Sequence, residues 1–115
     1  MTLEELKEAR NQEIDLNTSQ LIEVGFIFGG SLFSMSITAQ INWSNFPQLP
    51  DALFPLHITT KDDNTFILSL ANKMNFYFTA LSFKNGYLQS GGLLKAAIKA
   101  ALTIEEVELI IDNRT

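Results

Sequence analysis

The sequence predicts a small α+β domain, and three patterns support that prediction. Alternating aromatic residues flank the Gly29-Gly30 pair, which is typical of a β-hairpin. A second alternating segment encloses a polar turn, and a long apolar pattern with helical spacing follows over about 70–101. We therefore expect two short hairpins that form a small antiparallel sheet, packed on one long C-terminal helix, with short helices at both ends.

Composition excludes several classes of function. With 115 residues, we expect a single domain over residues 1–115. The absence of cysteine excludes disulfide frameworks and cysteine metal sites. No apolar run approaches the roughly 18 residues of a membrane span. The net charge of -5, without a basic stripe, argues against nucleic acid as a partner.

Charge is concentrated at the two ends of the chain. Residues 16–102 hold only nine charged side chains, which is sparse for the surface of a monomer. Two interpretations stay open. Either uncharged polar residues provide the solubility of this stretch, or a partner covers part of it.

The N-terminal segment begins with a capping box, in which the Thr2 hydroxyl accepts a backbone N–H and Glu5 reaches back. We expect a helix over about 3–13, then a polar break. A second short helix over 19–24 would end at Gly25, a natural C-terminal cap.

The first hairpin carries four apolar side chains that alternate around its turn: Phe26, Phe28, Phe33 and Met35. We expect them to share a face of the hairpin and to lie in the core. Glycine is needed at the turn because a primed turn requires positive φ. Ser34 or Ser36 then caps a short helix over about 37–43.

The second hairpin follows an irregular proline-containing connection over 46–55. Residues 56–60 and 65–68 flank the polar turn. Leu56 and Ile58 should face inwards, and His57 should face outwards.

The long helix is indicated by apolar residues at three- to four-residue spacing: Leu70, Met74, Tyr77, Leu81, Leu88, Leu94, Ile98 and Leu102. Ser69 is its expected cap, and Gly91 is one of three glycines at which it could kink or admit a close approach. A second capping box at Thr103 starts a terminal helix over about 104–111.

Aromatic residues on this helix supply the candidate interface. Successive helical residues point about 100° apart, so the three consecutive rings at 76–78 cannot all face one core. We expect Tyr77 to be core, and an interface role for Phe76 or Phe78. The candidate interface residues are Trp43, Phe76, Phe78, Phe83 and Tyr87.

The sequence offers no catalytic motif, and we predict neither catalytic residues, nor a cofactor, nor a metal. His57 is the only histidine, and a lone histidine without cysteine cannot form a zinc site of the usual type. A histidine on the outer face of a strand is its commoner role. Asp62 and Asp63 read as turn formers. The glycines at 25–30 lack the spacing of a phosphate or dinucleotide loop.

The order and spacing of several motifs resemble a bacteriophage family of a domain of unknown function, over about residue 5 to the end. That family occurs at the ends of tail-fibre and related virion proteins, or as small free-standing phage proteins. The matching positions are Lys7, Arg10, Gly25, Phe26, Phe28, Gly30, Phe33, Ser34, Ser36, Ala39, Gln40, Asn42, Trp43, Thr59, Thr60, Lys61, Asp62, Asp63, Leu94, Lys95, Ile98, Ala101, Thr103, Glu105 and Glu106. The chain departs from the family at His57-Ile58, where an aromatic is common, and at Gly91-Gly92, where a basic residue is common.

The resemblance implies a structural or accessory virion protein of the tail, tail fibre or baseplate, assembled in the host cytoplasm. Its implied partners are other phage virion proteins and copies of itself, and the family brings no catalytic residues.

Three alternatives stay open. The chain could be a fibre-assembly chaperone, absent from purified particles. It could be a tail module that binds host glycan through Trp43, Tyr77 or Tyr87. An enzyme would require His57 in a concave pocket beside a carboxylate.

Overall fold

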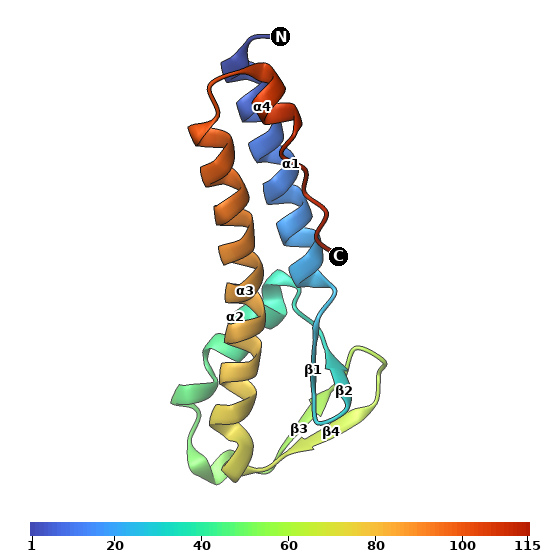
Figure 1. The fold of residues 1–115 in the computed structure, drawn as a ribbon. Coiled ribbons are helices and arrows are strands. Elements are labelled where there is room, and N and C mark those ends of the chain that lie inside the picture. The colour runs from blue at the N-terminus through green and yellow to red at the C-terminus, as the bar shows by residue number, and fades with distance from the viewer. The chain divides into compact units, whose positions relative to one another are not determined.

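The computed structural model describes residues 1–115, and its elements follow the predicted order (Figure 1). The helices are α1 (Leu3–Glu23), α2 (Ile37–Ser44), α3 (Lys73–Ala100) and α4 (Ile104–Glu108). The strands are β1 (Phe26–Phe28), β2 (Ser31–Phe33), β3 (Leu56–Thr59) and β4 (Thr65–Leu68). Short 3-10 turns lie at Phe46–Gln48, Asp51–Leu53 and Leu70–Asn72. The α+β prediction, with two hairpins, one long helix and helices at both ends, is confirmed.

The two hairpins form separate two-stranded antiparallel sheets instead of sharing one sheet, with β1 paired to β2 and β3 paired to β4. Gly29 and Gly30 have φ values of 56° and 80°, as the predicted primed turn requires. One backbone hydrogen bond of 2.8 Å, from the Lys61 N–H to the Leu32 carbonyl oxygen, connects the second hairpin to the first.

Contacts divide the chain into two compact units. We call residues 22–85 the hairpin unit, and residues 1–21 together with 86–115 the helical unit. Helices α1 and α3 contribute residues to both units. Each unit has its own buried residues.

Aromatic rings fill the core of the hairpin unit. Phe76 of α3 is fully buried. Its ring centroid lies 5.0 to 5.3 Å from the ring centroids of Phe26, Phe28, Phe33, Trp43 and Phe46. Most of these pairs meet edge to face, an arrangement that adds to the stabilisation from burial alone. The predicted core positions Phe26, Phe33 and Met35 are buried, whereas Phe28 is only partly buried.

Both serines proposed as caps of the short helix take part in its local structure. The Ser36 hydroxyl accepts a hydrogen bond from the Ala39 N–H at 3.2 Å and forms the N-cap of α2. The Ser34 carbonyl oxygen accepts a 2.8 Å bond from the indole N–H of Trp43. These bonds fix the helix that carries Trp43 against the strand that precedes it.

Helix α1 is continuous, so the predicted polar break is wrong. The Thr18 hydroxyl donates a 2.7 Å hydrogen bond to the Ile14 carbonyl oxygen one turn earlier. Because this bond satisfies the Thr18 hydroxyl within the helix, the polar segment can remain helical. The capping box at Thr2 is formed, with bonds of 3.1 and 3.2 Å to Glu5.

Two predictions about the later helices need correction. Ser69 makes no side-chain cap bond, and a 3-10 turn precedes α3 instead. Helix α4 ends at Glu108, short of the expected 111. The Thr103 hydroxyl does accept the Glu106 N–H at 3.1 Å, but the Glu106 carboxylate accepts from the Leu102 N–H, one residue before the expected donor.

Candidate protein-interaction face

The structure separates the neighbouring aromatics that we predicted as interface candidates. Phe76 has no exposed surface and lies in the aromatic core, so its ring is not available to a partner. Phe78 is 53% exposed. Tyr77 is partly buried, and its ring centroid lies 5.4 Å from that of Phe78. Phe78 is therefore the outward residue of the three.

The other predicted candidates lie apart from Phe78. Trp43 is half-buried, and Phe83 is partly buried with its ring centroid 6.2 Å from that of Phe26. Both rings therefore belong to the aromatic core of the hairpin unit. Tyr87 lies in the helical unit, where its hydroxyl donates a 3.3 Å bond to the Thr115 carbonyl oxygen.

An apolar row continues from Phe78 along the outside of α3 and into the 3-10 turn that precedes it. Its members are Leu70, Met74, Phe78 and Leu81, which are 45%, 40%, 53% and 38% exposed. We call these four residues the outer stripe. Met74, Phe78 and Leu81 are spaced by four and three residues and therefore lie on one side of α3.

The outer stripe exists because α3 is apolar on two sides in the hairpin unit. The inner row, Phe76, Ala80 and Phe83, packs into the core. The outer row has the same spacing but is offset by two residues, which corresponds to about 200° around a helix. The repeat starting at Leu70 thus predicted the helix correctly, but Leu70, Met74 and Leu81 do not line the core of the hairpin unit. Ile98, later in the same repeat, is buried in the helical unit. The interleaved row at 76, 80 and 83 was the signal that sequence reasoning missed.

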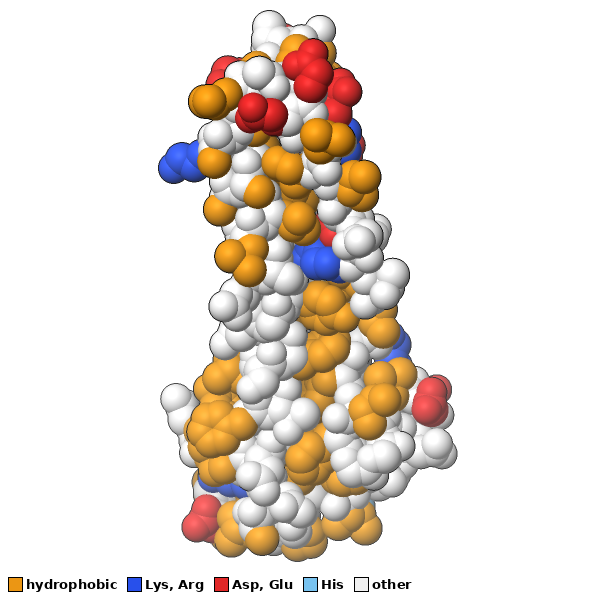
Figure 2. Space-filling view, viewed as in Figure 1, with side chains coloured by type: hydrophobic (Ala, Val, Ile, Leu, Met, Phe, Trp, Pro, Cys, Tyr) orange, Lys and Arg blue, Asp and Glu red, His pale blue; other side chains and the backbone are white.

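Neutral polar side chains border one side of the outer stripe. Asn75, Thr79 and Ser82 line a shallow depression together with Phe78. The Thr79 hydroxyl is occupied by a 2.7 Å bond to the Asn75 carbonyl oxygen. On the other side, Lys84 and Leu81 line a small hollow. Figure 2 shows that the visible surface of the hairpin unit is largely uncharged and carries many hydrophobic side chains.

A second hollow of the hairpin unit surrounds His57. It has a volume of about 540 Å³ and is lined by Asn42, Trp43, Asn45, Phe46, Leu49, Leu56, His57, Ile58 and Thr59. His57 is exposed on β3, facing outwards as predicted. The lining contains no carboxylate that could pair with its imidazole for acid–base chemistry.

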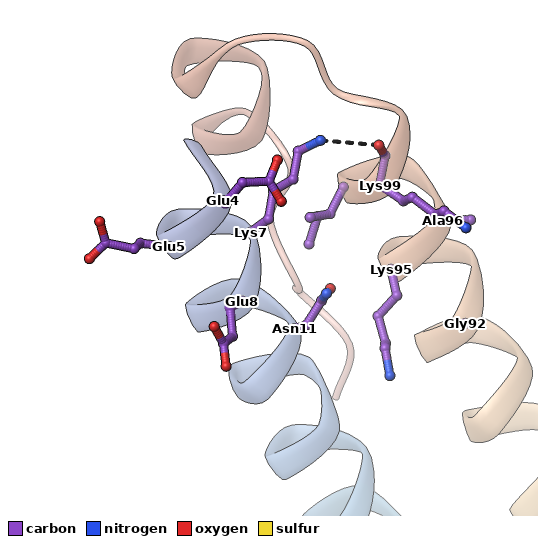
Figure 3. Close-up of a pocket in the computed structure, with 10 residues that line it drawn as sticks. Glu4, Glu5, Lys7, Glu8, Asn11, Gly92, Lys95, Ala96 and Lys99 are labelled. Carbon is purple, nitrogen blue, oxygen red and sulfur yellow. Dashed lines mark hydrogen bonds between the residues drawn. The ribbon is translucent and has the colours of Figure 1, made fainter. Parts of the chain in front are cut away.

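The helical unit carries a charged groove of about 760 Å³ (Figure 3). Glu4 and Glu8 of α1 lie on one side of it, and Lys95 and Lys99 of α3 on the other. The Lys7 ammonium donates a 3.1 Å bond to the Lys99 carbonyl oxygen across the groove. Since the two walls have opposite charge, the groove favours neither anions nor cations. The structure contains no group of three or more His, Cys, Asp or Glu side chains placed to hold a metal ion.

Arg114 joins three segments of the helical unit. Its guanidinium donates to the Asp112 carboxylate at 2.8 Å, the Thr18 hydroxyl at 2.8 Å and the Ser90 hydroxyl at 3.0 Å. Further bonds reach the carbonyl oxygens of Tyr87 and Ile14. Both charged side chains are largely buried, at 12% and 13% exposure. In Figure 1 the C-terminal tail runs beside α1, in agreement with these bonds.

The hydrogen bonds between Arg114 and Asp112 shift both pKa values. Hydrogen bonds from Arg114 hold the pKa of the Asp112 carboxyl far below its usual 3.8, although partial burial opposes the shift. The bond to Asp112 raises the pKa of Arg114.

Gly91 makes room for the Arg114 side chain, because a Cβ at position 91 would lie 2.8 Å from the Thr18 hydroxyl oxygen and 3.1 Å from an Arg114 nitrogen. The sequence analysis predicted a kink or a close approach at Gly91 but did not predict the bonds of Arg114.

Comparisons with known proteins give no match. No protein-family model, curated protein or solved structure aligns with this chain. The phage resemblance therefore rests on the sequence motifs. The helices of the structure include none that is both long and apolar enough to cross a membrane.

Proposed function

We propose that this chain is a structural or accessory component of a bacteriophage virion, in the tail, tail-fibre or baseplate region, and that it acts through protein–protein contacts without catalysis. The observation that carries the proposal is the outer stripe. Four large apolar side chains of α3 and the 3-10 turn before it are exposed, although α3 already buries a separate apolar row. Contiguous exposed apolar surface of this kind is typical of a protein-interaction site.

The charge distribution supports the same proposal. Acidic side chains gather near α4 and the start of α1, as Figure 2 shows, while Asn75, Thr79 and Ser82 beside the outer stripe are neutral. Interface centres are depleted in charge and enriched in aromatic residues and methionine, and the outer stripe contains Phe78 and Met74.

The experiment that tests the proposal is quantitative mass spectrometry of purified particles of the encoding phage. We expect the chain at a fixed copy number per particle. A Phe78→Ser variant should be depleted from particles, because it removes the most exposed ring of the stripe. Ile27→Ser is the matched control, since Ile27 is 69% exposed on β1, away from the stripe.

The fibre-assembly chaperone is the alternative that this experiment separates. A chaperone would also present apolar surface to other phage proteins, but it would leave before the particle is complete. Absence of the wild-type chain from purified particles, with its presence in infected cells, would favour the chaperone over the structural component.

A glycan-binding tail module is a second candidate, favoured by the hollow beside His57. Its lining combines Trp43 with the amides of Asn42 and Asn45, a combination suited to an uncharged sugar. Trp43 is the only tryptophan, so a change in its fluorescence would report sugar binding beside its ring. Saccharide titrations that leave the fluorescence unchanged would remove this candidate. Its rank is lower because the Trp43 ring is half-buried among other rings and its N–H is already bonded.

A further inference from the structure

We propose that the outer stripe pairs with the outer stripe of a second copy of this chain, with the two α3 helices parallel and the two Asn85 side chains facing each other. This inference rests on the proposed function, since it names one partner for the same face.

Three residues of the outer stripe, together with Asn85, have the spacing of a coiled-coil seam, and Leu70 flanks this seam at a g position. Met74, Phe78, Leu81 and Asn85 follow one another at intervals of four, three and four residues. These are the alternating d and a positions of a heptad pattern, in which two helices bury a shared narrow seam. Met74 and Leu81 take the d positions, and Phe78 and Asn85 take the a positions.

The charge of the face favours a second copy over a charged partner. When identical faces meet, any charge on the face meets itself, so a self-associating face must be neutral or self-complementary. The outer stripe is uncharged, and so are Asn75, Thr79 and Ser82 beside it. The whole chain carries a net charge of -5, so its acidic surfaces would repel the acidic surfaces of another copy. The uncharged outer stripe is free of this repulsion.

Lys73 and Lys84 are the two charged residues next to members of the outer stripe. Lys73 is buried, donates to the Leu49 carbonyl oxygen at 2.7 Å and lies 3.7 Å from the Asp51 carboxylate, so its charge is compensated inside the chain. Lys84 flanks the seam at a g position and is partly buried. In a parallel pair a g residue faces an e residue of the other helix, so the two Lys84 side chains do not meet.

The position of Asn85 favours the parallel orientation. A single asparagine at an a position can hydrogen-bond to its equivalent only when both helices run the same way in the same register. In an antiparallel pair centred on this seam, Asn85 would face Met74. Its amide would then be buried without a partner, which is unfavourable.

The size of the face sets the expected strength. Four side chains exposed by 38% to 53% provide on the order of 300 Å² of apolar surface per copy. Stable dimers bury roughly 800 Å² per partner. The association should therefore be weak for the isolated chain and appear only at high concentration. In an assembled particle, a high local concentration would make the same contact effective.

Because the chain has no cysteine, engineered single cysteines give an unambiguous test. Asn85→Cys, oxidised at high protein concentration, should give a disulfide-linked dimer. Ser82→Cys is the matched control, because it lies on the same helix but beside the seam, and it should cross-link at least tenfold less. Mixing Asn85→Cys with Met74→Cys tests the orientation, since only an antiparallel pair brings positions 85 and 74 together.

Light scattering over a concentration series provides the second measurement. We expect the wild-type mass to rise towards a dimer at high concentration, and Phe78→Ser to weaken that association at least tenfold. A wild-type chain that stays monomeric, or that cross-links through 85 and 74, overturns this inference. Neither result touches the proposed function, which fails only if the chain is missing from particles or if Phe78→Ser is incorporated normally.

Discussion

The hairpin unit and the helical unit are stabilised by different kinds of contact. In the hairpin unit, Phe76 and the rings around it are buried by neutral, apolar packing. In the helical unit, Arg114 and Asp112 add a largely buried charged pair to the apolar core formed by Ile14, Ile98 and Val107.

The difference has consequences for how each unit responds to change. Apolar packing depends on volume and is insensitive to pH, whereas a buried ion pair depends on geometry and on the protonation of its carboxylate. The surfaces differ in the same way, because the helical unit carries the charged groove and the hairpin unit carries the neutral outer stripe.

The largest effect is expected in the hairpin core. Phe76→Ala should lower the free energy of unfolding by about 3–5 kcal/mol, because it leaves a cavity among the surrounding rings. Phe78→Ala removes the same side chain from the exposed side of α3 and should cost less than about 1 kcal/mol. Urea unfolding followed by Trp43 fluorescence measures both. Equal losses from the two variants would contradict the assignment of inner and outer rows.

The next largest effect is expected from Arg114. Arg114→Ala leaves the Asp112 carboxylate largely buried without its partner, and should destabilise the helical unit by about 3 kcal/mol. Hydrogen exchange of amides in α1 and α4 is the measurement. The double variant Asp112→Asn with Arg114→Met should recover part of the loss, because it removes both charges. No recovery would mean that the bonds to Thr18 and Ser90 dominate.

Acid should destabilise the helical unit, because that unit contains the Asp112 carboxyl, whose pKa is lowered by its bonds to Arg114. The folded-state pKa of Asp112 lies below its unfolded value of about 3.8, so the pair stabilises the fold above that pH. This contribution is lost as pH falls from about 4 towards the lower folded-state pKa. We expect the wild-type unfolding free energy to fall over that range. Asp112→Asn should be less stable at pH 7 but show a smaller fall on acidification.

The smallest effect is expected from a matched pair of glycines in α3. Gly92→Ala meets open space, and should stabilise the helix by roughly 0.5–1 kcal/mol through alanine's higher helix propensity. Gly91→Ala gains the same propensity but crowds the Thr18 hydroxyl, which already bonds to Ile14 and Arg114. Gly91→Ala should therefore be about 1–2 kcal/mol less stable than Gly92→Ala. Equal thermal midpoints for the two variants would contradict the crowding at Gly91.

The sequence by itself determined the local elements of this protein. The capping box at Thr2, the Gly29-Gly30 turn and the polar turn at 61–64 each act through near neighbours, so their structures follow from short patterns. The prediction failed at the supposed break in α1, where the Thr18 hydroxyl of the polar segment forms a local hydrogen bond within the helix.

Only the tertiary structure decided which face of α3 is buried and what Arg114 holds together. Two apolar rows with the same spacing predict a helix equally well, and the choice between them depends on which row meets the hairpins and α2. Likewise, Arg114 bonds to Ile14 and Thr18, about one hundred positions earlier in the chain. Periodicity predicts the helix. Contacts between distant segments depend instead on the packing of the whole unit, and no local pattern in the sequence encodes that packing.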